Sequence, residues 1–219
     1  MRTVFAAVAL SLLGAGVYAT LVRPAAPPPA IPDRVDVVAR STARPAGPAV
    51  RTDLQETTYP VDGASADAVL RSLLARGPRE RGTPFFGLTT AQMELRFDPV
   101  ERAGACELRG VGVDLALTVR LPTWDAPVGT PLSLRADWRR FSDALRRHED
   151  EHVQIAKRGA DAIVQAVEGL RRATCAEADV DVRRRVDQLQ AEVEAAHRAY
   201  DEETGHGRTE GAVWPQPLR

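Results

Sequence analysis

The chain has 219 residues, enough for one ordinary domain with appended segments. Hydrophobic residues make up 44% of it, which is enough for a packed core. The formal net charge of -1 lacks the basic excess typical of nucleic-acid-binding proteins. We therefore expect a globular domain with no nucleic-acid partner.

Residues 1–22 have the pattern of an export signal. Arg2 supplies a positive charge, and nearly all the residues that follow are apolar or small. Val17 and Ala19 are residues that signal peptidase favours just before its cut. The apolar stretch of about 20 residues is also long enough to stay in place as a membrane anchor. Either interpretation predicts an exported protein, in the periplasm, the cell envelope or the medium, that touches a membrane only through an uncleaved N-terminus.

Residues 23–56 are expected to form a linker. They are rich in Pro, Ala and Arg and follow neither the period of a strand nor that of a helix. The folded domain is expected to span residues 57–219. It begins with a predicted edge strand at 57–61, because a sheet edge tolerates Pro60.

The next segments predict one short helix and two strands. Leucine and valine recur at helical spacing over residues 66–76, and Gly77 and Pro78 end that helix. Apolar and polar residues then alternate over 93–97 and 111–119, which is typical of half-buried antiparallel strands. An edge strand of such a sheet could bind an extended peptide by strand addition.

The C-terminal part of the chain is helical in character. One apolar face advances in steps of three or four from Trp138 to Leu170, and a second runs from Val182 to Tyr200 before Gly205 breaks it. The sequence therefore predicts an α+β domain, with a small antiparallel sheet packed on two long C-terminal helices.

The two cysteines of the chain, Cys106 and Cys175, fit an oxidising compartment. An even number of cysteines in an exported chain usually indicates a disulfide, so we expect these two to pair. The alternative is two buried thiols that remain reduced.

The first long helix carries a candidate metal motif. His148 and His152 are four residues apart, so their rings project from one face of the helix. They occupy inward-facing positions of the apolar stripe, where a shared Zn²⁺ would satisfy both imidazoles. Glu149 stands where the HExxH pattern places the carboxylate that takes a proton from water. The alternative is that the charged residues 146–151 only solvate the helix.

A catalytic zinc site needs a third protein ligand. The extended metzincin pattern is excluded, because Ile155 and Arg158 stand where its glycine and third histidine would be. His206 is one candidate, since its glycine neighbours allow the backbone to approach closely. Asp201 is another, as a ligand or as a partner that orients a histidine, and a different acidic residue is a third. His197 is expected to be a surface or packing residue.

Several segments together resemble a known bacterial family. They are Tyr59-Pro60-Val61-Asp62-Gly63, Leu121-Pro122-Thr123-Trp124, the HExxH motif at 148–152, and Tyr200-Asp201-Glu202-Glu203-Thr204-Gly205-His206-Gly207 with Gly211 and Trp214-Pro215. Over residues 59–214 the chain is similar to the domain of unknown function 922 family, whose members are described as predicted secreted zinc-dependent proteases. The resemblance implies zinc and proteolysis. Because zincins share the HExxH core, we expect a zincin-like domain with this motif on the first long helix.

These patterns favour an exported zinc metallohydrolase, a peptidase that acts on peptide or protein substrates. The residues expected to hold Zn²⁺ are His148, His152 and His206. Glu149 would act as general base, and Tyr200 or an arginine could stabilise the oxyanion. One alternative is a non-catalytic, zinc-stabilised binding module of the envelope, closed by both Asp201 and His206. Another is a metal-free envelope protein whose paired helices bind a partner.

Overall fold

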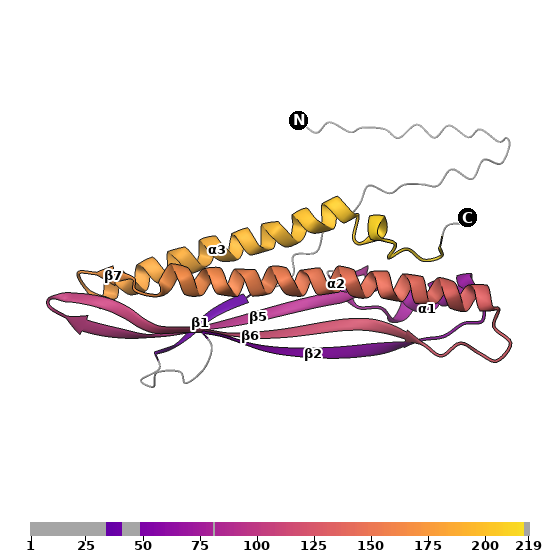
Figure 1. Ribbon diagram of the computed structural model, residues 1–219, viewed down its shortest axis with the longest axis horizontal. Coiled ribbons are helices and arrows are strands. Elements are labelled where there is room, and N and C mark those ends of the chain that lie inside the picture. Colours follow the sequence, from indigo (N-terminus) through magenta and orange to yellow (C-terminus); the bar gives the residue numbers. More distant parts are fainter. Residues whose placement is uncertain (1–33, 41–48, 81, 217–219) are drawn as a thin grey trace, which may run out of the picture.

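The computed structural model describes residues 34–40, 49–80 and 82–216, with side chains for the last two ranges (Figure 1). The expected export segment, residues 1–22, lies outside these ranges. Among the described helices, none combines the length and the apolar character needed to cross a bilayer.

The described residues form an α+β domain with long strands and two long helices. The strands are β1 (Arg34–Arg40), β2 (Val50–Val61), β3 (Arg79–Glu80), β4 (Thr83–Pro84), β5 (Leu88–Arg102), β6 (Ala105–Trp124) and β7 (Arg171–Arg172). The helices are α1 (Ala66–Arg76), α2 (Leu132–Val167), α3 (Cys175–Thr204) and a short 3-10 helix, η1 (Arg208–Glu210).

The main sheet is mixed, where the sequence predicted an antiparallel one. Its order is β1-β5-β6-β2, with β7 paired to the start of β6. The predicted antiparallel pairing holds for β5 and β6, whereas β1 runs parallel to β5 and β2 runs parallel to β6. The alternation of apolar residues indicates which face of a strand is buried, but it does not indicate the direction in which its neighbour runs.

The sheet also begins earlier in the chain than the expected domain start at residue 57. β1 and the first part of β2 lie within residues 23–56, which we expected to be an unstructured linker. Residues 51–58 of β2 are exposed on both faces, so they carry no alternating apolar pattern. Their backbone pairing with β6 defines the strand instead. The edge position predicted for the segment around Pro60 is confirmed, because β2 ends the sheet.

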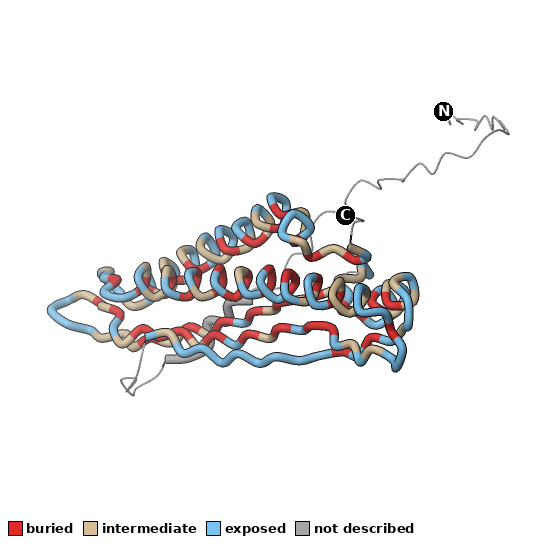
Figure 2. Tube along the Cα trace, turned by 45° about the vertical axis from the view of Figure 1, so that its right-hand side comes forward, coloured by how far each residue is buried: buried red, intermediate tan, exposed pale blue. Residues whose placement is uncertain are grey.

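The helices follow the sequence prediction closely. α1 spans the predicted residues 66–76, and Ser65 caps its N-terminus by accepting a hydrogen bond from the backbone N–H of Ala68. α2 lies along the sheet, and α3 lies against α2 (Figure 1). Buried residues are concentrated where α2 faces the sheet and where the two long helices meet, while β2 is mostly exposed (Figure 2). The core therefore lies between the sheet and the helices.

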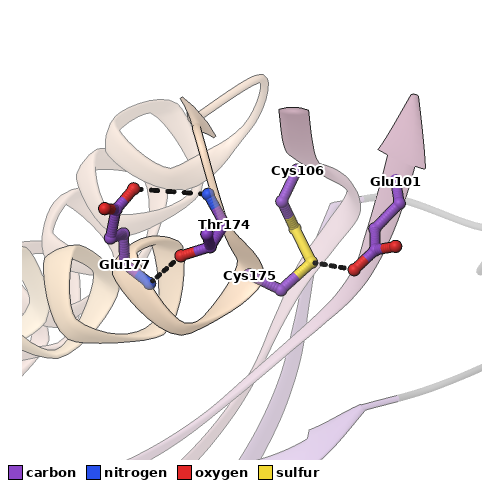
Figure 3. The surroundings of a disulfide bond; sticks show 5 residues. All are labelled: Glu101, Cys106, Thr174, Cys175 and Glu177. Atoms are coloured by element: carbon purple, nitrogen blue, oxygen red, sulfur yellow. Dashed lines mark hydrogen bonds between the residues drawn. A yellow bond between two sulfur atoms is a disulfide. The ribbon is translucent and has the colours of Figure 1, made fainter. Parts of the chain in front are cut away.

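A disulfide joins the sheet to the start of α3, as predicted. Cys106 on β6 and Cys175, the first residue of α3, are bonded to each other (Figure 3). Just before α3, the hydroxyl of Thr174 accepts a hydrogen bond from the backbone N–H of Glu177. The carboxylate of Glu177 accepts one in return from the backbone N–H of Thr174. This capping box and the disulfide fix the beginning of α3.

A glycine on α2 allows close contact between the two long helices. A Cβ atom on Gly159 would lie 2.3 Å from Cγ2 of Val193 on α3. The helices can therefore approach more closely here than a larger residue would permit. Val193 precedes Asp201 by about two turns, so this contact helps to hold the C-terminal end of α3 against the middle of α2.

Candidate metal centre

Three buried side chains from the two long helices converge on one point. His148 and His152 project from the middle of α2, and Asp201 lies in the last turn of α3. Their exposed fractions are 4%, 4% and 6%. One potential ligand atom from each lies within 4.8 Å of the other two. The spacing that the sequence indicated is therefore completed by a carboxylate from the second long helix.

A single oxygen of Asp201 is the meeting point of three imidazoles. Oδ1 lies 3.2 Å from Nε2 of His148 and 3.2 Å from Nε2 of His152. It also lies 3.3 Å from Nδ1 of His206. Burial acts to raise the pKa of Asp201, but the hydrogen bonds from these three histidines outweigh it and hold the pKa below its ordinary range. Asp201 is therefore a negatively charged carboxylate at neutral pH and could act as a metal ligand.

His206 reaches this point from the loop that follows α3. Gly205, His206 and Gly207 all adopt left-handed backbone conformations, with φ of 57°, 57° and 77°. Two of these three positions are glycines, which adopt that conformation without steric cost. A Cβ on Gly207 would also lie 3.0 Å from Cγ of His148. The turn thus folds back onto α2, although His206 is more exposed than the three convergent residues and stands outside their group.

His152 is oriented by a second histidine. Its Nδ1 lies 2.8 Å from Nδ1 of His197, which is 2% exposed and lies one turn before Asp201 on α3. Burial, followed by the proximity of His152, lowers the pKa of His197 to about 3. A neutral His197 can accept the Nδ1 proton of His152, which leaves Nε2 of His152 directed towards Asp201.

His148 is oriented by a carboxylate. Its Nδ1 lies 3.1 Å from Oε2 of Glu210 in η1. The Tyr200 hydroxyl donates to the same carboxylate at 2.9 and 3.1 Å, and the Tyr200 ring stacks on the ring of His148 with 4.9 Å between centroids. Glu210 and Tyr200 therefore fix the ring of His148 and leave its Nε2 pointing to Asp201.

Glu149 is buried beside the convergent residues. Its Oε2 accepts a hydrogen bond of 2.8 Å from the hydroxyl of Thr89 on β5, and its side chain is close to Gly87, where a Cβ would lie 2.5 Å from Oε1. Burial raises the pKa of the Glu149 carboxyl, and His152 and the Thr89 hydrogen bond only partly oppose this. Glu149 is thus a buried carboxyl with a raised pKa, a property that often marks groups which exchange protons at functional sites.

These residues line a cavity of about 400 Å³. His148, Glu149, His152, Asp201 and His206 all contribute to its wall. The remaining wall comes mainly from residues 83–89, from α1 and from the segment after η1. Tyr200 does not line the cavity, and its hydroxyl points to Glu210 instead.

The structure brings together every residue that the sequence singled out for the metal site, and it adds three more. His197, Glu210 and Thr89 contact those residues directly. His197 lies four residues before Asp201, the same spacing as the two histidines of α2, so its face of the helix could have been deduced. Glu210 and Thr89 lie in segments whose position beside α2 has no sequence signature.

The donor set is of a kind that binds metal ions. Two imidazoles, each oriented by a neighbouring group, and a carboxylate are ligands of the kind found around catalytic Zn²⁺. His206 is a fourth nitrogen close to the same oxygen. The buried His148–His152–Asp201 group could therefore hold a metal ion.

Comparison with protein families assigns the chain to a bacterial family. The model of the family described as "Bacterial protein of unknown function (DUF922)" matches residues 56–207. The chain belongs to this family. The DUF922 match covers both halves of the site, from the HExxH motif on α2 to His206 after α3. Neither the curated proteins nor the solved structures contain a match.

Proposed function

We propose that this DUF922 protein is a zinc-dependent metallohydrolase with a zincin-like site, and that it cleaves peptide bonds. One observation carries the proposal. The buried group His148, His152 and Asp201 shares the wall of one cavity with Glu149, a buried carboxyl whose pKa is raised. A group of metal ligands beside a proton acceptor, both open to one cavity, is the arrangement that hydrolysis requires.

His148, His152 and Asp201 would hold the ion, with His206 close enough to join them. A bound Zn²⁺ would polarise a carbonyl oxygen and lower the pKa of a bound water towards about 7. The hydroxyl of Thr89 donates a hydrogen bond to Oε2 of Glu149. The other carboxylate oxygen, Oε1, would therefore be the one that takes a proton. Glu149 would accept the proton of the attacking water at Oε1 and deliver it to the amine that leaves when the C–N bond breaks.

Tyr200 would act by orienting His148, and we do not assign it to the oxyanion. Its hydroxyl donates to Glu210, and its ring lies against His148 outside the cavity. The residues that face the reacting group would be those of the cavity wall. Among these, Arg208 carries a permanent positive charge.

The beginning of β5 offers an edge for the backbone of a peptide. β5 pairs with β6 from Leu88 onwards, whereas the described pairing with β1 starts only at Gln92. Leu88 and Thr89 also line the cavity. Among the described residues, no strand pairs with residues 88–91 on the side of β1, and an extended peptide could pair with them there.

Export of the protein forms part of this proposal. The Cys106–Cys175 disulfide is compatible with an oxidising compartment, where such bonds persist. The apolar pattern of residues 1–22 provides the signal or anchor. A peptidase of this kind would act in the periplasm or cell envelope.

The test compares two isosteric substitutions in the same motif. Glu149→Gln should retain the metal and lose at least about 100-fold in the rate of cleavage of fluorescein-labelled casein, as expected on loss of a general base. Asp150→Asn is the control, because Asp150 is exposed on the same helix. Full casein cleavage by zinc-loaded Glu149→Gln protein, or no cleavage by zinc-loaded wild type, would refute the proposed activity.

The position of His206 supports a second candidate, a zinc-stabilised binding module without catalysis. If His206 and Asp201 both bound the ion with His148 and His152, four protein ligands would close a structural site. The absorption spectrum of the cobalt-substituted protein separates the two. A spectrum that changes when acetohydroxamate is added favours the enzyme, and an unchanged four-coordinate spectrum favours the binding module.

A further inference from the structure

The cavity beside the metal centre is lined largely by apolar side chains. Those that extend beyond the metal centre come from four separate segments of the chain and include Leu74, Phe85, Phe86, Leu145, Val213 and Trp214. The polar side chains of its wall are those of the metal centre and Glu149, together with Thr83, Thr89 and Arg208. An apolar chamber that opens directly onto a hydrolytic centre would bind the part of the substrate next to the bond that is cut.

Aromatic packing holds this chamber in shape. Phe86 packs edge-on against Phe141 with 5.6 Å between ring centroids, and Phe141 packs against Trp214 at the same separation. The indole N–H of Trp214 donates to the backbone carbonyl of Ala66 at 3.0 Å. Phe141 is fully buried and Trp214 is 5% exposed, so these walls are part of the core. A ligand would therefore enter a preformed space.

The size of the chamber limits what can enter. Its volume of about 400 Å³ lies at the lower end of the range of ligand pockets, about 300–1,000 Å³. It can take one or two side chains together with a short piece of backbone. Each apolar side chain buried there would gain the free energy of leaving water.

We propose that this chamber receives a large apolar side chain, aromatic or long aliphatic, next to the bond that is cleaved. The inference rests on the proposed function, since it names the class of peptide that the same site would select. A small side chain would bury less apolar surface on entering, and an acidic one would find Arg208 as its one charged partner among the described wall residues outside the metal centre and Glu149. The enzyme would thus select peptides with phenylalanine or leucine at this position.

The test uses short peptide hydroxamates that differ only in the side chain nearest the hydroxamate, which is Phe, Leu, Gly or Asp. Their affinity for the zinc-loaded full chain is measured by calorimetry, and cleavage of the matching quenched-fluorescence peptides is measured separately. We expect the Phe and Leu compounds to bind at least about tenfold more tightly than Gly, with Asp the weakest.

Two leucines provide matched variants. Leu74 lines the chamber and is 40% exposed, whereas Leu54 lies on β2 outside it and is 44% exposed. Leu74→Lys should weaken binding of the Phe compound several-fold and strengthen that of Asp. Leu54→Lys should change neither affinity.

The outcomes separate the inference from the proposed function. Equal affinity across the series, or no binding of any compound, overturns the inference. Cleavage without a side-chain preference overturns it too, and leaves the hydrolase intact. The expected order of affinities without cleavage of any peptide supports the chamber's preference while refuting the catalytic proposal.

Discussion

Nδ1 of His152 lies 2.8 Å from Nδ1 of His197, so one imidazole hydrogen-bonds another across the contact between α2 and α3. For His152 to present Nε2 to a metal, its proton must lie on Nδ1 and His197 must accept it. The partner of a metal-binding histidine is usually a carboxylate or a carbonyl, and here a buried neutral imidazole takes that position.

Loss of this acceptor should weaken metal binding. We expect His197→Phe to reduce zinc affinity by about 10–100-fold, the usual effect of removing a partner that orients a ligand. His197→Gln keeps a carbonyl acceptor and should lose less. Zinc affinity is measured by competition with a chromogenic chelator. An affinity of His197→Phe equal to that of wild type would show that His197 does not orient His152.

Glu210 is expected to play the corresponding role for His148. Removal of its carboxylate in Glu210→Ala eliminates the acceptor 3.1 Å from Nδ1 of His148 and the acceptor of the Tyr200 hydroxyl. We expect zinc affinity to fall by about tenfold in the same chelator assay. Glu203→Ala, an exposed glutamate at the end of α3, is the control and should be neutral. Equal losses in the two variants would point to a general charge effect.

The close contact of α2 with α3 predicts a stability coupling. Gly159→Ala places a methyl group against Val193 and should lower the free energy of unfolding by about 1–2 kcal/mol, despite the better helix propensity of alanine. Val193→Ala removes the opposing methyl groups. In urea unfolding, the double variant should be more stable than the sum of the two single effects predicts. Strict additivity would mean that the helices adjust without strain.

The disulfide should contribute much of the stability of the oxidised protein. Cys106 and Cys175 are separated by 69 residues. In the chain-entropy model, closing a loop of that length lowers the entropy of the unfolded chain and so stabilises the folded state by about 4 kcal/mol. The Cys106→Ser/Cys175→Ser double variant should therefore unfold at a clearly lower urea concentration than the oxidised wild type. Identical unfolding midpoints for the two would contradict this expectation.

The sequence predicted those parts of the fold whose periodicity reflects burial. The bounds of α1, the alternation of β5 and β6, and the apolar faces of α2 and α3 all follow from side chains that face a single core. The parallel direction of β1 and β2 was missed, because pairing direction depends on the path of the connections. β2 was underestimated because residues 51–58 are exposed on both faces.

The candidate site, like the fold, was predicted from the sequence only in part. The helical spacing of His148 and His152 placed both rings on one face of α2. The two glycines beside His206 indicated a close approach of the backbone, and its Nδ1 lies 3.3 Å from Oδ1 of Asp201. Glu210 lies 62 residues from His148, and Thr89 lies 60 residues from Glu149. Only the folded chain brings such distant residues together, so local patterns could not identify them.

Metal content per chain tests the metal site itself, because both the proposed hydrolysis and its side-chain preference depend on the convergence of His148, His152 and Asp201. Mass spectrometry of the untagged, purified protein should find one zinc ion per chain. In the His148→Ala/His152→Ala variant, with its fold confirmed by circular dichroism, the zinc should fall to trace levels. A wild-type chain without stoichiometric metal after incubation with zinc and desalting, or a double variant that retains its zinc, would contradict the account.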